Sequence, residues 1–278
     1  MRAPGAWSRI NLVRRLVLVP TPIGNLGDVT LRALEALREA DVVACEDTRR
    51  TAKLLRHYGI ATPLVRLDQH TMDRAERLLA EHEVVAYASD AGTPGISDPG
   101  AELVRWAYGQ GAEVEVLPGP TAFVPALVAS GLPTARFVFE GFLPPAGKAR
   151  KRRLEALAGE GRTVVLYEAP HRLQATLRDL IALYGEDHPV AVARELSKRH
   201  EEVWRGRLGE AVSRFAEPRG EFVLVLGPRE AAAAEPDAEE LLARLRAEGF
   251  SGRALAEALE AAGVARNRAR RLAYKEDG

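Results

Sequence analysis

The sequence predicts an α/β protein with two domains and a small helical module near its C-terminus. Short runs rich in β-branched residues alternate with amphipathic helical patterns, and the alternation breaks at Gly131-Leu132-Pro133-Thr134 and at Ala231–Pro236. Such alternation is typical of largely parallel strands with helices between them. The 278 residues suit two domains of ordinary size plus an appendage. We expect a flexible arm at 1–15, domains at 16–131 and 132–230, and a helical module at 237–278.

Strands of the first domain are each expected to lead into a loop rich in Gly, Pro, Asp or Thr. The strands are Leu16–Val19, Val42–Cys45, Leu64–Leu67, Val84–Ala88 and Val114–Leu117. Helices are expected at Leu31–Ala40, Thr51–Tyr58, Met72–Glu83 and Ala101–Tyr108, and another opens after Ala122. Because ligands of open α/β sheets bind at the carboxyl ends of strands, these loops should line one crevice.

The second domain differs, because its later strands follow one another without intervening helices. The expected strands are Phe137–Gly141, Thr163–Tyr167, Val190–Arg194, Glu202–Arg205 and Phe222–Leu226, and the expected helices are 148–159, Leu173–Tyr184 and 208–215. This order indicates a mixed or partly antiparallel sheet. The C-terminal module should hold helices at 238–248, 253–262 and 265–274, punctuated by glycines.

The composition excludes several kinds of site and location. The 39 basic and 39 acidic residues cancel, so any affinity for nucleic acid must come from local patches. Cys45 is the single cysteine, which excludes an internal disulfide and a cysteine-held zinc or iron–sulfur site. No apolar run approaches the ~20 residues of a membrane span, and Pro20 and Pro22 cut the first run too short for a signal peptide. The histidines show no metal-ligand spacing, so we expect a cytoplasmic protein without a metal.

The loop Ser89–Gly100 carries the strongest functional signal. It reads Ser-Asp-Ala-Gly-Thr-Pro-Gly-Ile-Ser-Asp-Pro-Gly directly after an expected strand. Small residues allow a ligand close to the backbone, and prolines stiffen the path. The alternative is a tight connection in which Asp98 caps the next helix and Pro99 is its first residue. The loop's length, about 12 residues where such loops usually run 2–6, favours a binding role.

Other strand ends offer polar or irregular loops, each with a structural alternative. Pro20–Asp28 is a rigid, irregular loop, and Asp28 or the nearby Thr30 could simply cap the next helix. Thr121, which follows Pro118-Gly119-Pro120, could cap another helix. The acidic and basic residues of Cys45–Arg50 suit ion pairs as well as catalysis. Glu168, His171, Glu195 and Lys198 also follow strands, where salt bridges or caps are the simpler roles.

Together these loops resemble the tetrapyrrole methylase superfamily, and within it the branch that methylates a cytidine 2′-hydroxyl in 16S ribosomal RNA. The residues that carry the resemblance are Val19–Leu26, Glu46–Arg49, Ser89–Pro94, Pro118–Pro120, Gly141–Pro144, His171-Arg172 and Ala193–Leu196. It implies two α/β domains with S-adenosylmethionine in the cleft between them, in a homodimer. By motif position the cofactor contacts would be Pro22, Ala91, Gly92, Thr93, Ile96, Thr121, Ala122, Glu168 and Leu196. Thr93 stands where porphyrinoid-modifying relatives carry Asp.

A ribose hydroxyl is a poor nucleophile at neutral pH, so a positioned base should assist it. The candidates are Glu195, Asp47, Asp90 and Lys198, and of these we favour Glu195 with Lys198 nearby and Asp47 as an orienting group. RNA requires phosphate contacts, for which two basic stretches offer Lys148, Arg150, Lys151, Arg152, Arg153, Arg268 and Arg271. Either stretch could instead be a solvated charged face. The rival functions are a porphyrinoid methyltransferase, which needs an apolar pocket rather than basic patches, and a non-catalytic module that binds S-adenosylmethionine or RNA.

Overall fold

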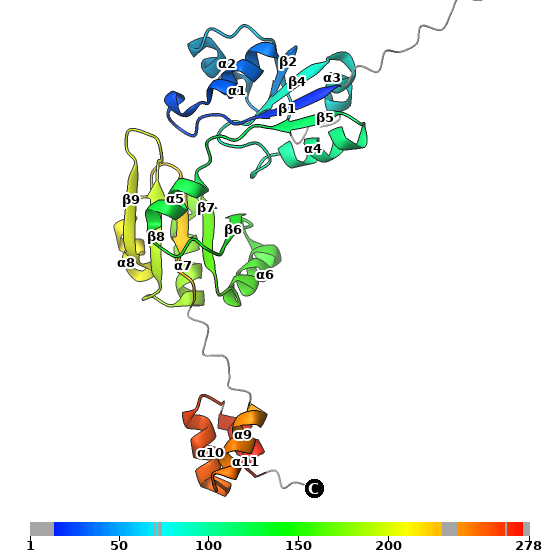
Figure 1. Ribbon diagram of the computed structural model, residues 1–278. Coiled ribbons are helices and arrows are strands. Elements are labelled where there is room, and N and C mark those ends of the chain that lie inside the picture. Colours follow the sequence, from blue (N-terminus) through cyan, green and yellow to red (C-terminus); the bar gives the residue numbers. More distant parts are fainter. Residues whose placement is uncertain (1–13, 69–70, 72–73, 230–237, 265, 275–278) are drawn as a thin grey trace, which may run out of the picture. The chain divides into compact units, whose positions relative to one another are not determined.

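The computed structural model describes residues 14–68, 71, 74–229, 238–264 and 266–274 (Figure 1). Two compact units divide the chain: Met1–Ala158 with Thr163–Gly227, and Gly159–Arg162 with Pro228–Gly278. Nearly all of the expected N-terminal arm, the expected linker Ala231–Pro236, and the expected helix starts Met72 and 265 lie outside the described residues. Within the described residues, no helix is long and apolar enough to cross a membrane.

The first sheet is entirely parallel, with strand order β3-β2-β4-β1-β5. Its strands are β1 (Arg15–Val19), β2 (Val42–Cys45), β3 (Leu64–Arg66), β4 (Val84–Ala88) and β5 (Glu113–Val116). The helices are the short 3-10 helix η1 (Leu26–Asp28), then α1 (Leu31–Glu39), α2 (Thr48–His57), α3 (Ala75–Glu81) and α4 (Gly100–Gly109). Helix α2 begins three residues before the expected Thr51, because the Asp47 carboxylate accepts the Arg49 N–H and caps it.

Alternation along the central strands produces two separate cores, one on each face of this sheet. Val17, Val43 and Ala86 pack with α1 and α2, whereas Leu18 and Tyr87 pack on the opposite face with α3 and α4. The central strands are buried on both faces, which explains their continuous apolar sequence.

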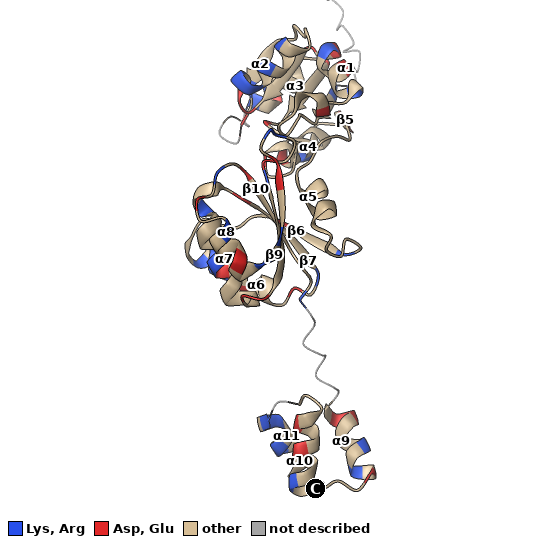
Figure 2. Ribbon diagram, turned by 90° about the vertical axis from the view of Figure 1, so that its left-hand side faces the viewer, with Lys and Arg blue, Asp and Glu red and all other residues tan. Residues whose placement is uncertain are grey.

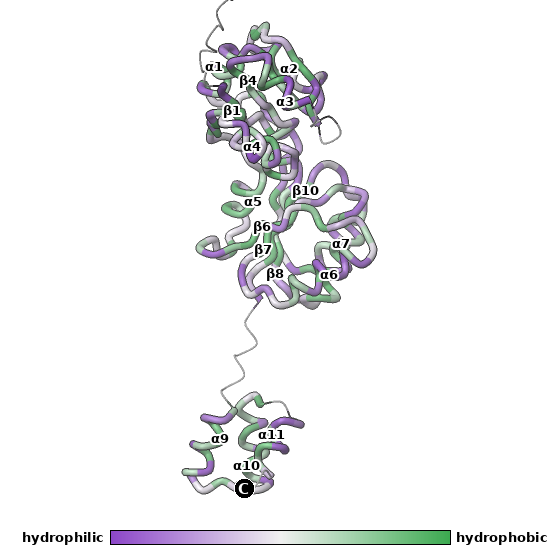
Figure 3. Tube along the Cα trace, turned by 90° about the vertical axis from the view of Figure 1, so that its right-hand side faces the viewer, coloured by the Kyte–Doolittle hydropathy of each residue, from purple (hydrophilic) through white to green (hydrophobic). Residues whose placement is uncertain are grey.

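The second sheet is mixed, as the sequence predicted. Its order is β6-β7-β10-β8-β9, with β6 and β7 parallel and the other pairs antiparallel. The strands are β6 (Phe137–Phe142), β7 (Thr163–Glu168), β8 (Pro189–Arg194), β9 (Glu202–Arg207) and β10 (Phe222–Leu226). Helices α6 (Gly147–Ala158), α7 (Pro170–Tyr184) and α8 (Leu208–Arg214) cover one face, and the hydrophobic α5 (Phe123–Ser130) packs on the other (Figure 3).

The C-terminal helices form a unit with its own apolar core. They are α9 (Ala238–Ala247), α10 (Gly252–Ala261) and α11 (Arg266–Ala273). Leu241 and Leu245 of α9 pack with Leu255 and Leu259 of α10 and with Ala269 of α11. Three amphipathic helices that share one buried stripe account for the helical module at the expected position.

Candidate functional site

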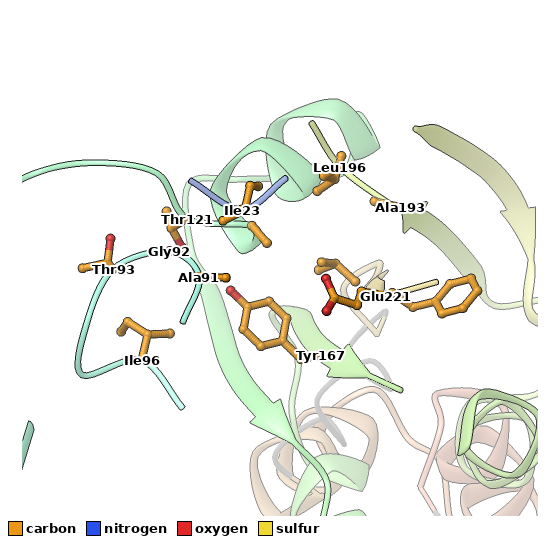
Figure 4. Close-up of a pocket in the computed structure, with 13 residues that line it drawn as sticks. Ile23, Ala91, Gly92, Thr93, Ile96, Thr121, Tyr167, Ala193, Leu196 and Glu221 are labelled. Carbon is orange, nitrogen blue, oxygen red and sulfur yellow. The ribbon is translucent and has the colours of Figure 1, made fainter. Parts of the chain in front are cut away.

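One pocket in the first unit gathers the loops that the sequence singled out (Figure 4). Loops after β1 and β4 and the start of α5 form one side, and β7, β8 and β10 with the segment after β8 form the other. The lining residues are Ile23, Ala91, Gly92, Thr93, Ile96, Thr121, Ala122, Tyr167, Ala193, Leu196, Glu221, Phe222 and Val223. Of the predicted cofactor contacts, this lining includes Ala91, Gly92, Thr93, Ile96, Thr121, Ala122 and Leu196.

A short bridge between two loops builds one wall of the pocket. The backbones of Thr21 and Gly92 exchange two N–H···O hydrogen bonds of 2.9 Å. The Ser89 hydroxyl donates to the Gly92 carbonyl at 2.7 Å, and the Thr21 hydroxyl donates to the Ser89 carbonyl at 2.9 Å. Gly92 has φ +84°, a conformation that favours glycine. The wall is therefore fixed by its own hydrogen bonds before any ligand binds.

Asp98 closes the rest of the Ser89–Gly100 loop. Its carboxylate accepts the Gly95 N–H at 2.9 Å and the Gly100 N–H at 2.8 Å. The loop thus begins a helix and lines the pocket at once, so the two roles weighed for it are not exclusive. Pro99 precedes α4 as its N-cap residue rather than being its first residue. The Thr93 hydroxyl joins this loop to the next by donating to the Pro120 carbonyl at 3.0 Å.

The start of α5 does not use Thr121 as a cap. Ala122 occupies the N-cap position, and no side chain caps the helix. Tyr167 of β7 points toward Thr121 and Ala91 in the pocket (Figure 4). Burial raises the pKa of Tyr167, while hydrogen bonds from the Thr121 hydroxyl and the backbone N–H groups of Phe123 and Ala122 oppose this rise. The sequence analysis missed Tyr167, although its spacing from Val165 places both on the α5 face of the strand.

Two predicted cofactor contacts have side chains outside this lining. Pro22 lines a separate pocket, and its neighbour Ile23 faces the pocket described above. Glu168 follows Tyr167 in β7, so its side chain points to the opposite face of the sheet. There its buried carboxylate accepts the Thr176 hydroxyl at 2.5 Å and the Ala169 N–H at 2.8 Å. Its assignment as a cofactor contact stays a prediction that this geometry does not favour.

Two of the three predicted catalytic residues meet at the pocket edge. Lys198 Nζ donates to Glu195 Oε1 at 2.8 Å and to Glu221 Oε2 at 2.9 Å, and the Glu221 N–H donates to Glu195 Oε1 at 2.9 Å. The hydrogen bond from Lys198 lowers the pKa of Glu195 against the effect of burial. Burial lowers the pKa of Lys198, but its bonds to both carboxylates outweigh this and raise it overall. Glu221, which the sequence analysis missed, contributes the carboxylate of the pocket lining.

Asp47, the third predicted catalytic residue, is not among the residues that line this pocket. Its carboxylate accepts the Arg49 side chain at 2.9 Å and the Arg49 backbone N–H at 2.9 Å. These bonds lower its pKa to about 2, so it is a weak base. The neighbouring Glu46 has a raised pKa because of burial and the nearby carboxylates of Asp98 and Asp90.

The predicted basic stretch on α6 divides into paired and exposed side chains. Arg150 donates to Asp179 at 2.8 Å, to the Thr176 hydroxyl at 2.9 Å and to the Pro144 carbonyl at 3.0 Å. Arg153 pairs with Glu140. The other predicted phosphate contacts are exposed, namely Lys148, Lys151 and Arg152 on α6 and Arg268 and Arg271 on α11. Lys151 lies 3.8 Å from Glu155.

Comparisons with known proteins agree on one family. The family described as Tetrapyrrole (Corrin/Porphyrin) Methylases matches residues 15–212. The Ribosomal RNA small subunit methyltransferase I of Synechocystis sp. is 52% identical over 217 residues, or 76% of this chain and 78% of that protein. The Escherichia coli O157:H7 protein of that name is 43% identical over 274 residues, or 95% of this chain and 96% of that protein.

A solved structure supports the same fold. Uroporphyrin-III C-methyl transferase from Thermus thermophilus, complexed with S-adenyl homocysteine, is similar with a TM-score of 0.57 and 24% identity. The match covers 77% of this chain and 97% of that one. The α/β fold class expected from the sequence, with helices at the C-terminal end, is thereby confirmed.

Proposed function

Because this chain belongs to the tetrapyrrole methylase family, we propose that it transfers a methyl group from S-adenosylmethionine to RNA of the small ribosomal subunit. The finer proposal is the 2′-hydroxyl of a cytidine in 16S RNA. The observation that carries the proposal is the similarity to proteins named for small-subunit RNA methylation, which extends over 95% of the chain. The pocket built from the family's loops supports it.

The residues that line the pocket suit the proposed cofactor in chemistry. Ala91, Gly92 and Ala193 leave space beside the backbone, and Ile23 and Leu196 add apolar surface. The Glu221 carboxylate offers an acceptor for ribose hydroxyls or for a cationic group. When bound, S-adenosylmethionine supplies an electrophilic methyl group on a sulfonium. The Thermus thermophilus enzyme of the same fold holds S-adenyl homocysteine.

The chain's own residues would position the ribose hydroxyl and exclude water. In-line displacement requires the nucleophile roughly 3–3.5 Å from the methyl carbon. We assign the positioning of the hydroxyl to Glu195, Lys198 and Glu221, in which Lys198 holds the two carboxylates in place. Glu221 lines the pocket, whereas Glu195 is occupied by two donors. Lys198 binds both carboxylates, but Glu195 Oε1 also accepts the Glu221 N–H. We therefore assign the role of proton acceptor to Glu221, because each further donor lowers the basicity of a carboxylate.

The protein's assembly and location complete the proposal. We propose a cytoplasmic homodimer that acts on 16S RNA or the assembled small ribosomal subunit. Exposed apolar side chains on α5, with Val128 68% exposed and Val124 43% exposed, offer surface for a second copy. Phe137 at the start of β6 is also exposed and lies 6.3 Å from Phe123 between ring centroids.

The decisive experiment offers labelled S-adenosylmethionine in parallel to undermethylated small subunits, naked 16S RNA and a porphyrinoid. We expect label on one ribose oxygen of the RNA, mapped by nuclease digestion and mass spectrometry. Label on the porphyrinoid alone would establish the rival methyltransferase function. Binding of cofactor and RNA without any transfer would establish the non-catalytic module. Label on a base nitrogen or carbon would contradict only the ribose assignment.

A further inference from the structure

Helix α2 presents a basic face beside the pocket wall. Half of its ten residues are basic, and these residues are Arg49, Arg50, Lys53, Arg56 and His57. All five are exposed, while Thr51, Leu54 and Leu55 form the buried side. Figure 2 shows the basic residues along this helix. No RNA contact is expected here from the sequence, in which the residues of Cys45–Arg50 at the helix start suit catalysis or ion pairs.

These cations are only partly neutralised. Arg50 lies 3.7 Å from Asp90 and is 60% exposed, so its guanidinium keeps donors for another anion. Within the described residues, Lys53 and Arg56 have no carboxylate within ion-pair distance. Only Arg49 is firmly paired, with Asp47. The helix therefore carries a positive surface that its own unit does not cancel.

A pocket lies against this face. It is lined by Thr21, Pro22, Leu26, Arg50, Thr51, Lys53, Leu54, Ser89 and Asp90. Its charged side chains are two cations, Arg50 and Lys53, and one carboxylate, Asp90, which leaves a net positive lining. Asp90 is itself engaged, since its Oδ1 accepts the Asp47 N–H at 2.9 Å.

The pocket beside α2 and the candidate cofactor pocket share a wall. Thr21 lines the pocket beside α2 and Gly92 lines the cofactor pocket, and these two residues are joined by the backbone bridge described above. Pro22 and Ile23 divide in the same way between the two pockets. An RNA strand with its reactive nucleotide at the cofactor pocket would therefore have a neighbouring phosphate within reach of α2.

We propose that α2 is the main phosphate-binding surface for the RNA substrate, with Arg50 and Lys53 holding a phosphodiester next to the target nucleotide. This inference rests on the proposed function. Helix α6 is the weaker candidate, because Arg150 is 11% exposed and tied to Asp179, and Arg153 is paired with Glu140. Phosphate contacts position the substrate without reading its sequence.

The test compares the double variant Arg50→Ala/Lys53→Ala with two matched double variants. Lys148→Ala/Arg152→Ala removes the same charge from α6, and Arg77→Ala/Arg105→Ala removes it from α3 and α4. Each protein is assayed for binding to a 16S RNA fragment across a sodium chloride series, for KM and kcat with small subunits, and for S-adenosylhomocysteine affinity. Circular dichroism checks that each variant is folded.

For the α2 variant we expect RNA binding about tenfold weaker near 0.1 M salt and a slope of log K against log salt reduced by about 0.7–0.9, the value for one lost phosphate contact. KM for RNA should rise while S-adenosylhomocysteine affinity stays unchanged, and the α3/α4 variant should match the wild type. A folded α2 variant with wild-type slope and KM, or a larger loss in the α6 variant, would overturn the inference. Wild-type protein that binds RNA through Arg50 and Lys53 but methylates none would overturn the proposed function and leave this surface supported.

Discussion

Substitution of Glu168 separates a structural role from cofactor binding. The resemblance to the family assigns Glu168 to the cofactor, but its carboxylate is buried against α7. We predict that Glu168→Ala destabilises the first unit and leaves the affinity for S-adenosylhomocysteine within about twofold of the wild type. The variant Glu168→Gln keeps the side-chain volume and one acceptor oxygen, and so serves as the matched control.

The expected magnitude follows from the bonds that would be lost. Thr176 donates to the carboxylate at 2.5 Å and itself accepts from Arg150 at 2.9 Å, while Arg172 lies 3.4 Å from Glu168. A hydrogen bond to a charged group contributes about 1.5–3 kcal/mol, and loss of one partner of a buried pair costs about 3–5 kcal/mol. Arg172 keeps carbonyl acceptors at Leu143 and Pro144, so we expect about 3 kcal/mol for Glu168→Ala.

Urea unfolding monitored by circular dichroism measures the change in free energy, and thermal unfolding should show Tm lowered by about 6–12 °C. Glu168→Gln should lose about half as much, because its amide oxygen still accepts from Thr176. Isothermal titration with S-adenosylhomocysteine measures the affinity of the folded variants. A tenfold loss of affinity with Tm unchanged within about 2 °C would refute the structural role and return Glu168 to the cofactor site.

Two further predictions concern the segments that follow β2 and β1. The bonds with Arg49 lower the pKa of Asp47 to about 2, so its charge stabilises the folded state above pH ~4 and this contribution is lost as pH falls toward 2. In urea unfolding, the difference in unfolding free energy between wild type and Asp47→Asn should be constant from pH 7 to 5 and narrow below pH 4. A difference that grows in acid would contradict this prediction. Gly24→Ala would place a Cβ 2.4 Å from Lys198 Cγ, so kcat should fall roughly tenfold or more as the Lys198 side chain shifts. The control is Gly109→Ala, whose Cβ would meet nothing within 4 Å, and this variant should keep wild-type turnover.

Strand positions were predictable because burial on both faces demands continuous apolar runs. The segments Val42–Cys45 and Val84–Ala88 are both expected and observed strands, and all of their residues except the partly buried Val84 are buried. That the loops line one crevice was predictable from their place after the strands, whereas the individual contact residues came from the family resemblance. Tyr167 and Glu221 were not predicted, because Tyr167 lies in strand β7 and Glu221 directly precedes β10, where no loop motif marks them.

Ion-pair partners were the least predictable feature, because they depend on contacts between distant segments. Arg150 meets Asp179, which is 29 residues away, and Arg153 meets Glu140 on the neighbouring strand β6. In the sequence all five cations of the α6 stretch look alike. Burial distinguishes only Arg150, since a buried charge requires a partner, whereas Arg153 is half exposed and still pairs with Glu140. A count of basic residues along the sequence does not separate the paired cations of α6 from the others.

The wall shared by the two pockets also explains how one set of loops can contact both the proposed cofactor and the proposed RNA substrate. Thr21 and Gly92 are joined through their backbones, and the hydroxyls of Thr21 and Ser89 support this bridge. One face of the wall can then be small and apolar for a cofactor, while the other face meets Arg50 and Lys53. A wall fixed in advance spares both ligands the entropy of ordering it. Because Arg50 and Lys53 make none of these bonds, their substitution should change RNA affinity without changing cofactor affinity, which is the separation that the α2 variant measures.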